Sequence, residues 1–454
     1  MTTGTGRQQA GNTQAEKSGD MNLLDRIFIT LLLIVFGGIV LHAPLTVGFE
    51  TLFPHFELLI KSWKEILLGA ATVLGGVVLL QKRQLAILKQ PVLLLIAGYA
   101  LLHLLLLVLI PGEVTSSLAG ILIDLRYLLF FVLVLIAVRL YPQSRRWLLV
   151  TGLVGALVVL IFAVLQATIL PPDILKFIGY SQTTIAPYLT VDQNMDFIRI
   201  NSTLRGPNSL GAYAVITLTL LLTIGLKGYH QQFKRPMGIV AILGIGNIVA
   251  LWASYSRSAL IGAVVAVGTV LIYTFRRRIT KWVWIGMIAL AVVLGGIFVA
   301  ARNTDFVSNV VLHEDRGEGN NVNSNDGHVS SLIDGARLML TQPYGAGIGS
   351  TGSASLYGDQ PLIIENQYLF IAHEAGWVGL ALFLGIFVSV LMSLWRGRAD
   401  WLAFGVFASG IGLAIIGMVL PVWADDTIGI IWWGLAAIAV GSVEIGNGRG
   451  KTRT

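Results

Sequence analysis

Cysteine is absent from the 454-residue chain, and charged residues make up only 12% of it. The absence of cysteine excludes disulfide bonds, thiolate metal sites and cysteine nucleophiles. The charged fraction is about half of that in soluble domains, which excludes an ordinary soluble enzyme. The chain is instead rich in apolar residues, and 55% of it is hydrophobic. This composition predicts a protein embedded in a membrane.

Apolar runs close to the ~20 residues needed to cross a bilayer recur along the whole chain. The fold class expected is therefore all-α, a polytopic bundle of about twelve transmembrane helices. The expected spans are 27–45, 63–80, 92–110, 118–140, 147–170, 210–226, 237–253, 259–275, 282–300, 367–395, 401–422 and 428–443. Residues 1–21 and 445–454 are expected to be tails, and 22–444 a single membrane domain.

The distribution of Lys and Arg predicts the orientation of the bundle. With the N-terminus in the cytoplasm, 21 of the 31 basic residues fall in cytoplasmic segments, as the positive-inside rule requires. The net charge of +7 is then chiefly an orientation signal, and both termini are expected in the cytoplasm. The outer loops 171–209 and 302–366 are the long ones, and long loops are often functional. Any chemistry is therefore expected on the outer face.

Arginines at the outer ends of the expected spans are the first candidates for a site. Arg199 and Arg205 precede the Gly206-Pro207-Asn208 turn, where Asn208 or Ser209 is expected to cap the next helix. A helix N-terminus adds donors and partial positive charge, so this segment suits an anion. An anchor to lipid headgroups is the alternative.

Two further arginines lie in or beside the spans. Arg257 sits in the short turn before the span at 259–275, where anchoring to lipid headgroups is the alternative to a site role. Arg126 lies inside the span at 118–140. Asp124 and Arg126 point to different helix faces, so each is expected to find its partner on another helix. A structural role for Asp124 and Arg126 between helices fits the sequence as well as a functional one.

The second long outer loop carries two patterns. Leu332, Ala336 and Leu340 are spaced as on a short amphipathic helix lying over the membrane face, with His328 and Arg337 on the same segment. A glycine-rich turn follows, whose backbone can approach a ligand closely although simple loop flexibility also accounts for it. Its glycines are Gly345, Gly347 and Gly349.

Glu365 stands next to Asn366 at the mouth of the span 367–395. A carboxylate there, opposite several arginines, can serve as a general base. For His373 and Glu374, deeper in the same span, we expect structural hydrogen bonds within the bundle.

The order of these motifs resembles the O-antigen ligase and polymerase superfamily of membrane glycosyltransferases. The resemblance covers about residues 199–380 and lies in segments 205–208, 255–257, 343–349, 366–369 and 374–379. Ligases of the family commonly have His where this chain has Glu365, and many members have Arg near the place of His328. These departures favour a polymerase-like or otherwise specialised transferase.

The resemblance implies transfer of a glycan from a polyprenyl-diphosphate carrier to an acceptor hydroxyl of a glycan or glycolipid. It implies a multi-pass protein of the bacterial plasma (inner) membrane with an extracytoplasmic active site. We expect Arg205 and Arg257 at the diphosphate, supported by Arg126, Arg199 or Arg337. Glu365 is expected as the base, with His328 as the alternative, and Asn366 with the glycine-rich loop as support. No metal, cofactor or nucleic acid is expected.

The alternative function is a secondary transporter or glycan exporter, since twelve spans with both termini inside is a common transporter layout. Many such transporters join two six-span halves through a long cytoplasmic loop. Here the central cytoplasmic loop is short and the longest loop is on the outside, which favours the transferase.

Overall fold

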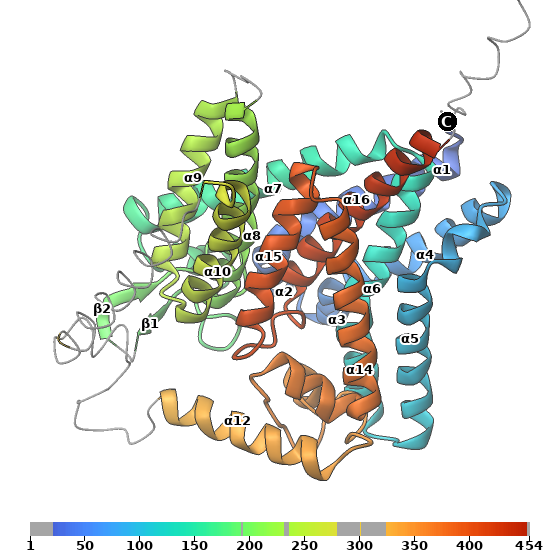
Figure 1. Cartoon of the computed structure of the whole chain (residues 1–454). Helices are drawn as coiled ribbons and strands as arrows, with labels where there is room; N and C mark the ends of the chain where they lie inside the picture. The colour runs from blue at the N-terminus through green and yellow to red at the C-terminus, as the bar shows by residue number, and fades with distance from the viewer. Residues whose placement is uncertain (1–20, 192–193, 231–235, 279–299, 301–323, 452–454) are drawn as a thin grey trace, which may run out of the picture.

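The fold is a bundle of long apolar helices with one helix, α12, lying across one end (Figure 1). The computed structural model describes residues 21–191, 194–230, 236–278, 300 and 324–451. The first half contains α1 (Leu23–Gly38), η1 (Ile39–Leu41), α2 (His42–Leu52), η2 (Pro54–Phe56), α3 (Glu57–Lys61), α4 (Trp63–Gln81), η3 (Leu85–Lys89), α5 (Pro91–Leu109), α6 (Val114–Leu140), α7 (Ser144–Thr168), η4 (Ile174–Ile178), β1 (Leu189–Val191) and β2 (Asn194–Arg199). The second half contains α8 (Pro207–His230), α9 (Pro236–Ala253), α10 (Arg257–Phe275), α12 (Ser324–Thr341), α13 (Gly352–Ser355), α14 (Gln367–Arg396), α15 (Trp401–Ile416) and α16 (Asp426–Lys451).

The predicted fold class, a bundle of apolar helices, is confirmed. Among the described residues, eight helices are long and apolar enough to span a membrane, and three shorter apolar helices accompany them. The expected span at 282–300 lies outside the described residues except for its last residue. The total of twelve spans and the orientation stay predictions.

The centre of the bundle is the pair α6 and α16. Two thirds of the most apolar stretch of α6 is buried inside the protein, and its main partner is α16. Trp432 and Trp433 on α16 meet edge to face, with ring centroids 5.1 Å apart, and Trp423 lies 5.1 Å from Trp432. Edge-to-face packing of this kind stabilises a core beyond the area it buries.

Helices α10 and α15 cross closely because glycines face each other. A Cβ added to Gly262 would lie 2.9 Å from the carbonyl oxygen of Gly412, and one added to Gly412 would lie 2.6 Å from that of Gly262. Such crossings through small residues are typical of membrane helices, where van der Waals contact replaces the hydrophobic effect. The crossing therefore holds the C-terminal part of α15 against the N-terminal part of α10.

Both long segments expected as outer loops contain secondary structure. Segment 171–209 includes η4 and an antiparallel hairpin of β1 and β2, which the sequence analysis did not predict. Segment 302–366 includes α12, the predicted amphipathic helix, on which Leu332 and Ala336 are half-buried as expected but Leu340 is not. Gly335 is buried and Leu338 packs against the core, whereas Leu340 is 67% exposed. The hairpin and α12 lie at the same end of the bundle, opposite the C-terminus (Figure 1).

Candidate active site

The segment before α8 is joined to the turn between α9 and α10 by direct hydrogen bonds. The amide of Ile200 donates to the carbonyl of Ala253 at 3.1 Å. The Nε of Arg199 donates to the carbonyl of Ser254 at 3.0 Å, and its Nη2 donates to Oδ1 of Asn208 at 2.7 Å. Both arginine-bearing motifs of the sequence, 199–209 and 254–258, therefore meet at one place.

The first turns of α8 and α10 also pack closely. A Cβ added to Gly211 would lie 2.6 Å from the Cβ of Ala259 and 3.0 Å from that of Ser256. Arg205 lies just before α8, and Arg257 is the first residue of α10. The side chain of Arg205 is exposed and has no ion pair among the described residues. Two helix N-termini, each bearing an arginine, thus lie side by side.

The loop between α15 and α16 connects this region to α14. The hydroxyl of Ser209 donates to a carboxylate oxygen of Asp425. Two residues earlier in that loop, the amide of Trp423 donates to Oε1 of Gln367 at 2.8 Å. Gln367 is the first residue of α14, and its own amide donates to the carbonyl of Gly417 at 2.8 Å. The N-terminal ends of α8, α10, α14 and α16 are therefore linked at one end of the bundle.

Glu365 and Asn366 lie directly before α14. Asn366 is the N-cap, because its side-chain oxygen accepts from the amides of Tyr368 and Leu369 at 2.9 Å each. Its Nδ2 donates to the carbonyl of Met418 at 2.6 Å, which fixes the segment to the loop after α15. The amide of Glu365 donates to Oγ of Ser331 on α12 at 3.2 Å, and the side chain of Glu365 is half-buried. Asn366 thus fixes the backbone directly after Glu365, and its role as support for a site stays a prediction.

Two residues in this region have left-handed backbone angles although neither is glycine. Tyr255 has φ +47° in the turn before α10, and Ser202 has φ +52° in the turn before α8. Ser202 is held there because its amide donates to Gln166 at 2.9 Å and its hydroxyl to the carbonyl of Val159 at 2.7 Å. Such strained positions cost about 1–3 kcal/mol each and concentrate at functional sites.

One expectation about this region was wrong. Neither Asn208 nor Ser209 caps α8, because the helix begins at Pro207 and both lie inside its first turn. Proline suits the first helical position, where its fixed φ fits and its missing N–H is not needed. The side chains of Asn208 and Ser209 are instead free to bind Arg199 and Asp425.

Arg126 lies in a buried network of charges rather than in an open position. Its guanidinium forms an ion pair with Asp426 on α16, lies 3.6 Å from Glu65 on α4 and donates to the carbonyl of Ala424 at 2.6 Å. Lys64 is 3.1 Å from Asp426 in the same network. The prediction that Arg126 has partners on other helices is confirmed. The geometry favours the structural role for Arg126 over direct binding of a diphosphate.

The glycine-rich loop is held against the bundle by its glycines. Gly345, Gly347 and Gly349 have φ between +81° and +100°. A Cβ on Gly345 would lie 2.6 Å from the carbonyl oxygen of Glu374, and one on Gly349 would overlap that of Ser116. Simple loop flexibility is therefore not what these glycines provide, because the left-handed turns press the backbone onto α6 and α14.

A kink in α14 receives this loop. Gly376 interrupts the helix with φ +67° and ψ −172°. The amide of Ala346 donates to the freed carbonyl of His373 at 2.6 Å, and the amide of Trp377 donates to that of Pro343 at 2.9 Å. The loop thus replaces the helical hydrogen bonds that the kink removes.

Three buried ionisable residues lie beneath the loop. The Nε2 of His103 on α5 is 3.1 Å from Asp124 on α6, and Glu374 on α14 contacts Asp124. Glu374 accepts from the amide of Thr351 at 3.3 Å, which confirms its expected structural hydrogen bond. Nδ1 of His373 has no hydrogen-bond partner among the described residues, so the same expectation for its ring is not confirmed.

Sequence analysis did not identify the partners of Asp124 and Arg126. His103, Lys64, Glu65 and Asp426 were not singled out, although all are ionisable residues in or at the edge of apolar spans. That property is a signal for a functional or structural role in a membrane protein. It does not identify partners, because they lie on helices far apart in the sequence.

The remaining predicted residues lie on α12. The side chain of Arg337 is exposed and has no ion pair among the described residues. The backbone of His328 lies in α12, while its side chain lies outside the described part of the structure. Within the described ranges, no group of three or more His, Asp or Glu side chains is arranged to hold a metal ion.

The middle of the chain matches a known protein family. Residues 238–384 match the family model Wzy_C, described as "O-Antigen ligase". The match covers about a third of the chain and includes α9, α10, α12, α13 and the first half of α14. No curated protein matches the chain significantly. These findings give no support to the transporter alternative.

Proposed function

From the match of residues 238–384 to the O-antigen ligase family model, we propose that this membrane protein is a metal-independent glycosyltransferase acting at the end of the bundle covered by α12. It transfers a glycan from a polyprenyl-diphosphate carrier to an acceptor hydroxyl, on the extracytoplasmic face of the bacterial inner membrane. The charge pattern of the loops supports this orientation. The observation that carries the proposal is the meeting of the α8 and α10 N-termini, with Arg205 and Arg257, beside the α14 N-terminus that follows Glu365.

Arg205 and Arg257 bind the diphosphate in this proposal. Each lies at a helix N-terminus, where the backbone amides and the helix dipole add to the charge of the guanidinium. Arg205 has an exposed side chain with no competing carboxylate in the described structure. Arg199 is a positioning residue, because Ser254 and Asn208 hold its guanidinium between the two helices. Arg337 is exposed on α12, the helix whose Ser331 accepts from the amide of Glu365.

Glu365 is the general base. The acceptor hydroxyl oxygen attacks the anomeric carbon, and its proton passes to the carboxylate of Glu365. The bond from that carbon to the diphosphate oxygen breaks, and the electron pair leaves with the polyprenyl diphosphate. Arginines stabilise the charge on the departing oxygens, which is the main need of such a step. His328 is the alternative base.

The diphosphate assignment is tested by measuring release of polyprenyl diphosphate in membranes containing the full chain and a lipid-linked glycan. Arg205→Ala and Arg257→Ala are each expected to lower the rate at matched protein levels by tenfold or more, on the order of one lost charge-assisted hydrogen bond. The control is Arg277→Ala, an exposed arginine after α10 at the other end of that helix. Equal rates in all three variants and the wild type would refute the assignment.

A further inference from the structure

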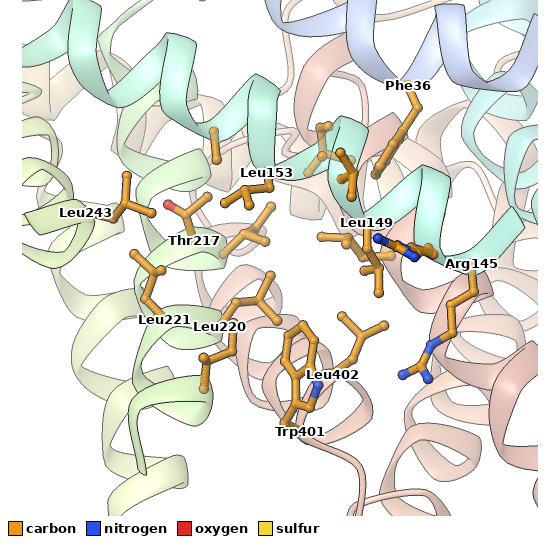
Figure 2. A pocket seen from close by; sticks show the side chains of 18 of the residues that line it. Phe36, Arg145, Leu149, Leu153, Thr217, Leu220, Leu221, Leu243, Trp401 and Leu402 are labelled. Atoms are coloured by element: carbon orange, nitrogen blue, oxygen red, sulfur yellow. The ribbon is translucent and has the colours of Figure 1, made fainter. Parts of the chain in front are cut away.

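An apolar cavity lies between α7 and α8, away from the candidate active site. It has a volume of about 500 Å³ and is also lined by single residues or pairs from α1, α9, α15 and α16 (Figure 2). Leu149, Leu153 and Leu160 of α7 face Leu220 and Leu221 of α8 across it. The volume is in the range of cavities that hold small ligands.

Most of the side chains that line this cavity are apolar. Thr217 lines it, but its hydroxyl donates to Asn247 at 2.7 Å and is therefore already satisfied. Leu153 on the rim is 46% exposed, and Val150 beside it is 52% exposed, so the cavity opens on the lipid-facing side of α7. Its chemistry suits a hydrocarbon chain that enters from the bilayer.

Two arginines stand at one mouth of the cavity. Arg145 and Arg146 line it at the start of α7, which is the end of the bundle opposite α12. Nη2 of Arg145 is 3.1 Å from Asp400, while its buried Nε has no hydrogen-bond partner in the described structure. Arg146 is exposed and lies within ion-pair distance of no carboxylate among the described residues. The mouth thus has an excess of positive charge and free donors.

Two tryptophans near this mouth indicate that it lies at the membrane surface. Trp401 lines the cavity beside Arg145, and Trp147 is 38% exposed one residue after Arg146. Tryptophan is enriched at the headgroup level of membrane proteins. From Arg145 to Leu160 the cavity follows about 22 Å of α7 at the rise of an α-helix, which exceeds the ~15 Å of one leaflet.

We propose that this cavity binds one acyl chain of an anionic phospholipid, whose phosphate lies against Arg145 and Arg146. The positive-inside pattern assigns that mouth to the cytoplasmic leaflet. Charge complementarity selects the anionic headgroup, and the apolar wall takes the chain. The occupant is not the proposed glycan donor, because the diphosphate of the donor belongs at the α12 end. Exclusion of the donor rests on the proposed function, whereas binding of a phospholipid in this cavity does not.

The test is native mass spectrometry of the purified full chain after incubation with dioleoyl phosphatidylglycerol or dioleoyl phosphatidylcholine. The wild type is expected to retain one phosphatidylglycerol, about tenfold more than phosphatidylcholine. Leu153→Trp fills the cavity and is expected to lower retention about tenfold. Val154→Trp is the matched control, because Val154 is 54% exposed on the same helix and does not line the cavity.

A second pair of variants tests the headgroup without changing the apolar wall. Arg146→Glu is expected to remove the preference for phosphatidylglycerol, whereas Arg26→Glu, an exposed arginine near the start of α1, keeps it. Equal retention by Leu153→Trp and Val154→Trp would overturn the proposal. Equal retention of the two lipids by the wild type, or a polyprenyl phosphate as the lipid that co-purifies in the cavity, would overturn it as well.

Discussion

Arg199 and Asn208 are joined by a hydrogen bond of 2.7 Å that spans the turn into α8. The same guanidinium also donates to the carbonyl of Ser254 before α10, so it ties together the two segments that carry Arg205 and Arg257. Together with the Ile200–Ala253 hydrogen bond, this side chain therefore fixes the two segments before the helix N-termini of the proposed diphosphate site.

Asn208→Ala removes one of the two anchors of Arg199. We expect the rate of glycan transfer to fall about tenfold, because a hydrogen bond to a charged group contributes on the order of 1.5 kcal/mol or more. Asn208→Asp keeps an acceptor oxygen and is expected to restore most of the activity. The measurement is turnover at saturating donor together with the thermal midpoint in detergent. A rate for Asn208→Ala equal to that of the wild type would contradict the positioning role.

Arg126→Ala is expected to destabilise the fold. It leaves the half-buried carboxylates of Asp426 and Glu65 without this cation, with Lys64 still paired to Asp426, and breaking a fully buried ion pair costs at most about 3–5 kcal/mol. A large fall in the midpoint of thermal unfolding in detergent would show this. Arg205→Ala is the control, since its exposed side chain should leave the midpoint unchanged while lowering turnover. Equal midpoints for the wild type and Arg126→Ala would argue against the structural role.

Gly349→Ala is expected to disrupt the glycine-rich loop. The added Cβ would overlap the carbonyl oxygen of Ser116, and φ at this position is +81°. The backbone strain alone costs about 1–3 kcal/mol. Gly76→Ala on α4 is the matched control, because nothing lies within 4 Å of its added Cβ. Protease sensitivity of the loop should rise in the first variant only, and similar digestion of both would refute the account of these glycines.

The sequence predicted the helical class and most of the helices because apolar runs and spacing are local properties. It also predicted that Asp124 and Arg126 have partners on other helices, since adjacent faces can be deduced from spacing within one helix. It could not identify His103 or Asp426 as those partners, because that depends on the packing of distant segments. The exposure of Leu340 on α12 was not predicted for the same reason, since the inward side of α12 is set at Gly335 by Leu369 and Ile364 from another segment.

For the candidate site, sequence reasoning found the motifs but not their linkage. The bond of Asn366 to Met418 and that of Ser209 to Asp425 join segments more than fifty residues apart. Neither residue pair has a local sequence signature. The strained angles of Tyr255 and Ser202 were also out of reach, because glycine or asparagine is the usual signal for such positions.

The most direct test of the central claim is the rate of polyprenyl diphosphate release by purified Glu365→Gln in nanodiscs with a lipid-linked glycan and acceptor. Glu57→Gln, an exposed carboxylate on α3 that pairs with Lys61, is the control. Loss of a general base is expected to lower the rate about a hundredfold or more, with the thermal midpoint unchanged. A rate for Glu365→Gln equal to that of Glu57→Gln would contradict the account.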